Sequence, residues 1–90
     1  MPRKREAVLS NLARKGFKLT EGDHIFLVYH RVDGLKTPIR TKVSRGSAHR
    51  DISDSLLGQM AKQVRLNKSA FLELIDCTLD QTGFEQLVRP

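Results

Sequence analysis

Residues 24–43, "HIFLVYHRVDGLKTPIRTKV", contain two stretches rich in β-branched and aromatic residues on either side of Asp33-Gly34. Such residues favour β-strands, and Asp-Gly between two of these stretches is a strong signal for a two-residue hairpin turn. The sequence therefore predicts two long antiparallel strands. Residues 17–19, which are followed by the turn residues "TEGD", predict a short third strand before them.

A two-residue turn would determine which residues of the hairpin lie opposite each other. It pairs Val28 with Ile39 and His24 with Val43. The face expected to pack under helices then carries Phe26, Val28, Ile39 and Val43. The other face is basic with one aromatic residue, and it carries Tyr29, Arg31, Lys36, Pro38, Arg40 and Lys42 beside Ile25 and Leu27. A three-residue loop would reverse the faces.

The segments around this sheet have the apolar periodicity of α-helices. Helices are expected over about residues 4–15, 54–65 and 68–78, followed by a short terminal helix. They should cover one face of the sheet. This arrangement is an α+β fold with a small three-stranded antiparallel sheet and the element order α-β-β-β-α-α. The expected common core consists of Leu12, Phe26, Ile39, Leu57, Met60 and Phe71.

Capping residues mark the ends of the expected helices. Gly16 stands where a left-handed residue would end the first helix. Asn67 can cap the third helix. Thr82, with Glu85 three residues later, has the spacing of a capping box before the terminal helix.

Length and composition bound the class of protein. Ninety residues are enough for a single domain, residues 1–90, with one core. The one cysteine, Cys77, excludes an internal disulfide framework and a cysteine-rich zinc site, and it favours a reducing compartment such as the cytoplasm. No apolar run approaches the roughly 20 residues that a membrane-spanning helix needs, so no membrane association is expected.

The formal charge of +6 is unevenly distributed along the chain. Residues 1–50 contain 12 lysines and arginines against 4 acids, whereas residues 51–90 contain 4 against 6. Clustered positive charge commonly meets nucleic-acid phosphate, because neutralising phosphates releases condensed counterions; a solvated surface is the simpler alternative. The candidate RNA-binding residues are Arg40, Lys42, Arg45, Arg50 and Tyr29.

His24 begins the first long strand, directly after the turn residues Gly22 and Asp23. By composition alone, a lone histidine is more often structural than catalytic. Metal binding is not expected, because His24 and His30 stand six residues apart on one strand, roughly 20 Å at the usual rise, and no acidic cluster joins them. No Walker motif, nucleophile elbow or dinucleotide-binding glycine set occurs, so no cofactor is predicted.

Several motifs together resemble the HicA-type (YcfA-like) toxins. They are a helix ending in Lys-Gly-Phe at residues 15–17, the turn and strand "GDHIFLVY" at residues 22–29, and packed helices after a third strand. The resemblance covers about residues 5 to 79. It implies a HicA-like core within residues 1–79, a short C-terminal extension over residues 80–90, and a double-stranded-RNA-binding-domain-like fold. Asp23 stands where the family usually has a small hydroxyl residue.

Members of this family are metal-independent ribonucleases that act on messenger RNA and are neutralised by a HicB-type antitoxin. The resemblance therefore implies that His24 is a catalytic general base for RNA cleavage. Two other functions stay open: an RNA-binding module without catalysis, and a protein-interaction subunit that uses the sheet or the terminal helices. Self-association into a homo-oligomer also stays open.

Overall fold

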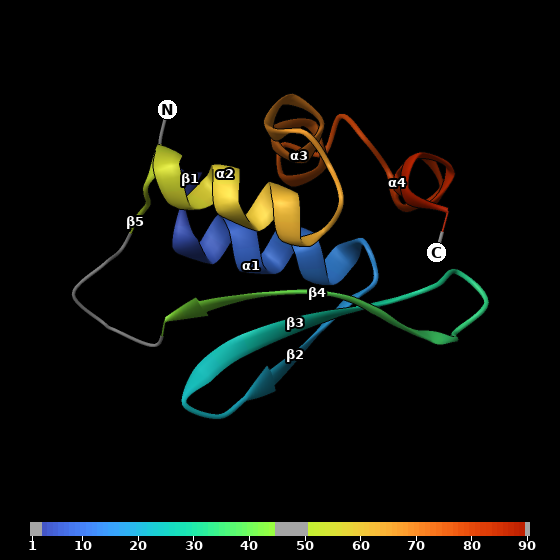
Figure 1. Cartoon of the computed structure of the whole chain (residues 1–90), viewed down its shortest axis with the longest axis horizontal. Coiled ribbons are helices and arrows are strands. Elements are labelled where there is room, and N and C mark those ends of the chain that lie inside the picture. The colour runs from blue at the N-terminus through green and yellow to red at the C-terminus, as the bar shows by residue number, and fades with distance from the viewer. Residues whose placement is uncertain (1–2, 45–50, 90) are drawn as a thin grey trace.

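The predicted three-stranded antiparallel sheet is present in the computed structural model, which describes residues 3–44 and 51–89 (Figure 1). Its strands are β2 (Phe17–Glu21), β3 (His24–His30) and β4 (Lys36–Ser44), with β3 in the middle. A separate two-stranded ladder pairs β1 (Arg3–Lys4) with β5 (Asp51–Ile52). The sequence did not indicate this ladder, because strands of two residues carry no hydrophobic period.

The described part of the chain has four helices: α1 (Arg5–Arg14), α2 (Asp54–Gln63), α3 (Lys68–Ile75) and α4 (Gln81–Val88). α1 and α2 lie on one face of the sheet, and α3 packs against both of them (Figure 1). α4 lies at the end of the molecule where the β3–β4 hairpin turns. The predicted α+β class with helices over one face is confirmed, and the first three helices end one to three residues earlier than expected.

Two of the three helix caps predicted from the sequence are present in the structure. Gly16 ends α1 in the left-handed conformation, with φ +97°. The Asn67 side chain accepts a hydrogen bond from a backbone amide in the first turn of α3. The predicted capping box at Thr82 is wrong, because Asp80 caps α4 instead. The Asp80 carboxylate offers an acceptor two residues earlier, so Thr82 already lies within the helix.

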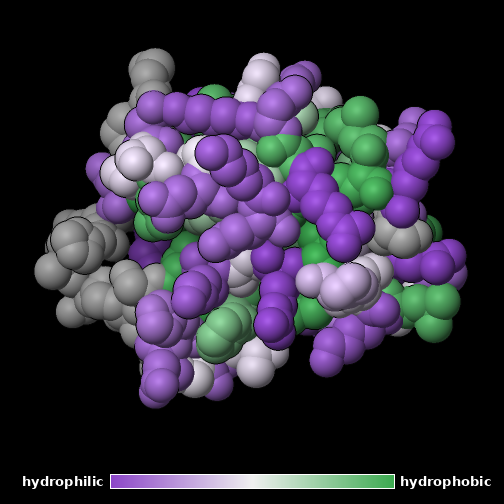
Figure 2. Space-filling view, viewed as in Figure 1, coloured by the Kyte–Doolittle hydropathy of each residue, from purple (hydrophilic) through white to green (hydrophobic). Residues whose placement is uncertain are grey.

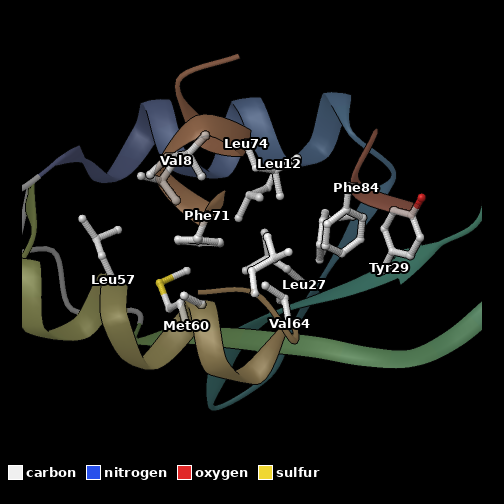
Figure 3. Packing of buried hydrophobic residues seen from close by; sticks show 14 of the residues in the cluster. Val8, Leu12, Leu27, Tyr29, Leu57, Met60, Val64, Phe71, Leu74 and Phe84 are labelled. Carbon is white, nitrogen blue, oxygen red and sulfur yellow. The ribbon is translucent and has the colours of Figure 1, made fainter. Parts of the chain in front are cut away.

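The hydrophobic core lies between the helices and the sheet (Figure 3). Five of the six predicted core residues are buried, namely Leu12, Ile39, Leu57, Met60 and Phe71. The sixth, Phe26, is only half-buried. Phe84 of α4 is fully buried in the same cluster, so the segment expected as a short extension contributes to the core.

The loop of the β3–β4 hairpin explains the misplacement of Phe26. The Arg31 N–H donates to the Leu35 carbonyl oxygen, and the Gly34 N–H donates to the Arg31 carbonyl oxygen, both at 2.8 Å. Three residues, 32–34, therefore form the loop. Gly34 takes the left-handed conformation that such loops need, with φ +92°. The predicted two-residue turn is wrong.

A three-residue loop shifts the pairing by one residue and reverses the faces of β3 relative to β4. Val28 lies opposite Arg40, and the predicted pair of Val28 with Ile39 does not form. Nearer the turn, β4 has two more residues than β3 between paired positions, where Pro38 has no N–H to offer. Side chains alternate along a strand with a period of two, so two extra residues do not change which residues of β4 share a face with those of β3. The faces therefore stay as the three-residue loop determines them.

The outcome is that β3 is inverted and β4 is as predicted. Leu27 and Tyr29 are fully buried under the helices, whereas Phe26 and Val28 point to the other face. In β4, Ile39 is buried as predicted, and so is Val43. The outward positions predicted for Ile25, Leu27 and Tyr29 are therefore wrong, and so are the inward positions of Phe26 and Val28.

Candidate nucleic-acid interface

The face of the sheet that points away from the helices is basic. Side chains alternate along each strand, and paired residues of neighbouring strands share a face. One row across the sheet therefore consists of Lys18, Val28 and Arg40, and the next consists of Thr20, Phe26 and Lys42. The three cations are exposed, and the two apolar side chains between them are half-buried. We call this surface the outer face.

His24 lies on the outer face at the start of β3. It pairs across the sheet with Ser44, and its ring centroid is 6.3 Å from that of Phe26. The preceding turn closes with a hydrogen bond from the Gly22 N–H to the His24 carbonyl oxygen at 3.0 Å. The imidazole is half-buried and Asp23 is exposed beside it. The predicted pairing of His24 with Val43 is wrong, because the three-residue loop shifts the register by one residue. His24 therefore shares the outer face with an aromatic ring and with cations.

The cations of the outer face have no acidic partner in the part of the chain that the structure describes. Ion pairs there join other cations to acids: Arg3 with Asp76 at 3.0 Å, Arg31 with Asp33 at 2.8 Å, and Lys68 with Asp54. The hydrogen bond from Lys68 lowers the pKa of Asp54 to about 2, and the one from Arg3 lowers the pKa of Asp76. The positive charge of Lys18, Arg40 and Lys42 is thus available to a ligand.

A hollow of about 270 Å³ opens where the outer face meets the free edge of β4. Its lining residues are Phe26, Arg40, Thr41, Lys42 and Gln63. Four of them come from the sheet, and Gln63 is the last residue of α2. The Thr41 hydroxyl donates a hydrogen bond to the side-chain oxygen of Gln63, which ties the edge of the sheet to the helix above it.

The sequence had indicated Tyr29 as an RNA-binding residue on the outer face, but the position of its side chain rules this out. It lies on the helix side, with its ring centroid 5.1 Å from that of Phe17 and 4.7 Å from that of Phe84. Figure 3 shows Tyr29 beside Phe84 in the core. Removal from water raises the pKa of its phenol to about 12. Its hydroxyl has no partner of acceptable hydrogen-bond geometry among the described residues, although Gln81 lies close enough to influence the pKa.

Of the other four predicted RNA-binding residues, the structure describes two. Arg40 and Lys42 lie on the outer face as expected. Arg45 and Arg50 lie outside the described residues. Sequence reasoning missed Phe26 and Gln63 as members of the site. The alternative three-residue loop would have placed Phe26 on the outer face, so the sequence did contain a signal for it. Nothing in the local sequence around Gln63 links it to β4.

Apolar side chains are also exposed away from this site. Val32 in the hairpin loop and Leu35 directly after it are 62% and 57% exposed. Figure 2 shows mostly hydrophilic residues on the side in view, with hydrophobic residues at the end where the hairpin turns.

No group of three or more histidine, cysteine, aspartate or glutamate residues that could hold a metal ion occurs within residues 3–44 and 51–89. Over the same described ranges, no helix is long and apolar enough to cross a membrane. No protein-family model, curated protein or solved structure matches this chain.

Proposed function

We propose that the chain is an RNA-binding protein that cleaves RNA at the outer face, with His24 as a general base that needs no metal ion. The observation that carries this proposal is the placement of His24 beside Phe26 on a surface whose cations have no acidic partner among the described residues. Phosphate binding needs such cations, and cleavage needs a base beside them.

The chemistry uses the 2′-hydroxyl of the RNA. A ring nitrogen of His24 takes the 2′-OH proton, and the oxygen attacks the adjacent phosphorus. The bond from phosphorus to the 5′-oxygen breaks, a cyclic phosphate forms, and the leaving oxygen takes a proton from water. Arg40 and Lys42 stabilise the charge that builds on the phosphate oxygens.

The resemblance to the HicA-type toxins extends the proposal to fold and setting. The order of α1, the sheet strands β2 to β4 and α2 is the α-β-β-β-α order of a double-stranded-RNA-binding domain. The substrate is then messenger RNA in the cytoplasm, and the neutralising partner is a HicB-type antitoxin. Co-purification with the product of an adjacent antitoxin-like reading frame would support this setting.

Cleavage of a labelled RNA in the presence of a chelator tests the proposal. His24→Ala should lower the cleavage rate roughly 100-fold or more and leave RNA affinity unchanged, because general-base contributions are typically of that size. A substrate with 2′-deoxyribose at the cleaved position should not react.

His30→Ala is the matched control, since His30 lies on the same strand and its Nδ1 is 3.1 Å from the Val28 carbonyl oxygen. It should retain cleavage. If wild type and His24→Ala cleave at the same background rate, the catalytic role is wrong.

One observation favours a second candidate, an RNA-binding module without catalysis. The carboxylate of Asp23 is exposed next to His24, where it repels phosphate. In that case, replacing Arg40 and Lys42 with Ala would flatten the salt dependence of RNA binding, and His24→Ala would change neither affinity nor cleavage. Asp23→Ser separates the roles: a faster variant shows that Asp23 attenuates cleavage, and a slower one shows that it orients His24.

A further inference from the structure

The hollow at the edge of β4 has the chemistry of a site for a single nucleotide. Phe26 provides a half-exposed aromatic ring, and Arg40 and Lys42 provide charge on the neighbouring strand. Aromatic rings that stack bases and cations that hold phosphates are the two components of single-strand binding surfaces. Here both line one cavity rather than being scattered over the sheet.

Gln63 adds a hydrogen-bond donor at the helix side of the hollow. Its side-chain oxygen accepts from the Thr41 hydroxyl. That contact orients the amide and directs the Nε2 group away from Thr41. Among the described residues no hydrogen bond engages Nε2, and the side chain is exposed, so this donor is available to an acceptor on a base edge.

The size of the hollow limits what it can hold. About 270 Å³ is close to the lower end of small-ligand pockets, which start at about 300 Å³. This volume suits one nucleotide. In an RNA duplex the faces of the bases are stacked on one another and cannot reach an aromatic side chain, whereas the unstacked bases of a single strand can.

We propose that this hollow binds one nucleotide of a single-stranded RNA, with its base stacked on Phe26, its phosphates at Arg40 and Lys42, and a base acceptor at Gln63 Nε2. The inference rests on the proposed RNA-binding function and names its substrate class. The centroid of the His24 ring lies 6.3 Å from that of Phe26, so a nucleotide stacked on Phe26 would lie near the proposed general base.

Three probes separate stacking from charge: a 2′-O-methyl single strand, the same chain with abasic sites, and a duplex of equal length. The 2′-O-methyl group blocks cleavage, so fluorescence anisotropy reports binding alone. Phe26→Ala should weaken binding of the single strand roughly 10-fold, and leave binding of the abasic strand and the duplex unchanged. Gln63→Ala should cause a smaller loss, about 3-fold, again only where bases are present.

Matched variants control for folding and for general surface effects. Phe26→Tyr should keep wild-type affinity, and Phe26→Leu, which retains apolar packing, should bind like Phe26→Ala. Gln86→Ala on α4 removes an exposed glutamine away from the hollow and should change nothing. Circular dichroism checks that each variant is folded. Arg40→Ala and Lys42→Ala should weaken binding of all three probes, because each probe carries phosphates.

The results distinguish this inference from the function on which it rests. If Phe26→Ala weakens binding of the abasic strand as much as binding of the intact strand, the stacking site is wrong. It is also wrong if Phe26→Ala weakens binding of neither strand. Tighter binding of the duplex than of the single strand by wild type would also overturn it. If no probe binds wild type at low salt, RNA binding itself fails. If Phe26 behaves as expected and His24→Ala does not slow cleavage, the nucleotide site stands and the catalytic role falls.

Discussion

Gly16, just after α1, lies against both β3 and α4. Its φ of +97° lies in the left-handed region. A Cβ at this position would lie 2.7 Å from the His30 carbonyl oxygen and 2.5 Å from Gln81 Nε2. The His30 N–H also donates to the Gly16 carbonyl oxygen at 2.8 Å, so the backbone of β3 cannot withdraw without losing that bond.

Gly16→Ala should therefore be more costly than an ordinary glycine substitution. Left-handed strain costs roughly 1–2 kcal/mol, and the clash with backbone adds to it, so the free energy of unfolding should fall by more than about 2 kcal/mol. Denaturant titration measures this. Gly34→Ala is the control, because Gly34 has φ +92° and no atom within 4 Å of its added Cβ. Equal losses in the two variants would contradict the role of close packing.

At the scale of single elements, α2 and α3 end in the same hydrogen-bonded motif. After α2, the Leu66 N–H donates to the Ala61 carbonyl oxygen at 2.9 Å and the Arg65 N–H donates to that of Lys62 at 3.1 Å. These are the two bonds of a Schellman motif. The left-handed position is held by Arg65 in α2 and by Cys77 in α3, both with φ 66°. Most helices that end this way use glycine there.

Arg65→Gly should stabilise the protein by about 1 kcal/mol, because glycine adopts the left-handed conformation without the strain of a Cβ. Thermal and denaturant unfolding measure the change. Lys62→Gly, one turn earlier and within α2, is the matched control and should destabilise the protein by about 1 kcal/mol. A loss of stability in Arg65→Gly would show that the arginine side chain makes a contribution larger than the backbone strain.

For the whole molecule, α4 joins the end of the chain to the middle strand of the sheet. The Phe84 ring lies 5.5 Å from that of Phe17 and 4.7 Å from that of Tyr29. Gln81 Nε2 donates to the His30 carbonyl oxygen at 3.2 Å, and the Val32 N–H donates to the Glu85 carboxylate at 3.2 Å. α4 thereby covers Tyr29 and excludes water from it.

Phe84→Ala should lower the free energy of unfolding by about 3–5 kcal/mol, the usual cost of removing a buried phenylalanine ring. Water should then reach Tyr29, and its pKa should fall from about 12 toward the ordinary value of 10.0. Tyr29 is the only tyrosine, so the near-ultraviolet absorbance of phenolate reports its titration without interference.

The sign of the pH effect follows from the raised pKa. Tyr29 stabilises the fold below its unfolded pKa near 10.0, and this contribution is lost as the pH rises through about 12. Wild type should lose stability over that window more steeply than Phe84→Ala. Leu87→Ala, at a 58% exposed position of the same helix, should alter neither stability nor titration. A folded wild type whose tyrosine titrates at the ordinary value would contradict burial by α4.

The sequence by itself determined the features that depend on near neighbours. The helical periodicity located the three longer predicted helices, Gly16 and Asn67 were recognised at their ends, and the inward positions of Ile39 and Val43 followed from alternation in β4. Arg40 and Lys42 were placed on the outer face for the same reason. Thr82 was mistaken for a cap because Asp80 and Thr82 both have an oxygen that can accept from a helix amide.

Only the tertiary structure decided which face of β3 is buried. Asp33-Gly34 suits a two-residue turn and also a three-residue loop with Gly34 left-handed, and the two loops differ by one residue of register. Residues 25–29 are apolar or aromatic without interruption, so the two faces of β3 are nearly equally hydrophobic. Hydropathy therefore does not indicate which face is buried. The choice depends on distant partners, since Tyr29 packs against Phe17 and Phe84 in the core, which leaves Phe26 on the outer face near His24.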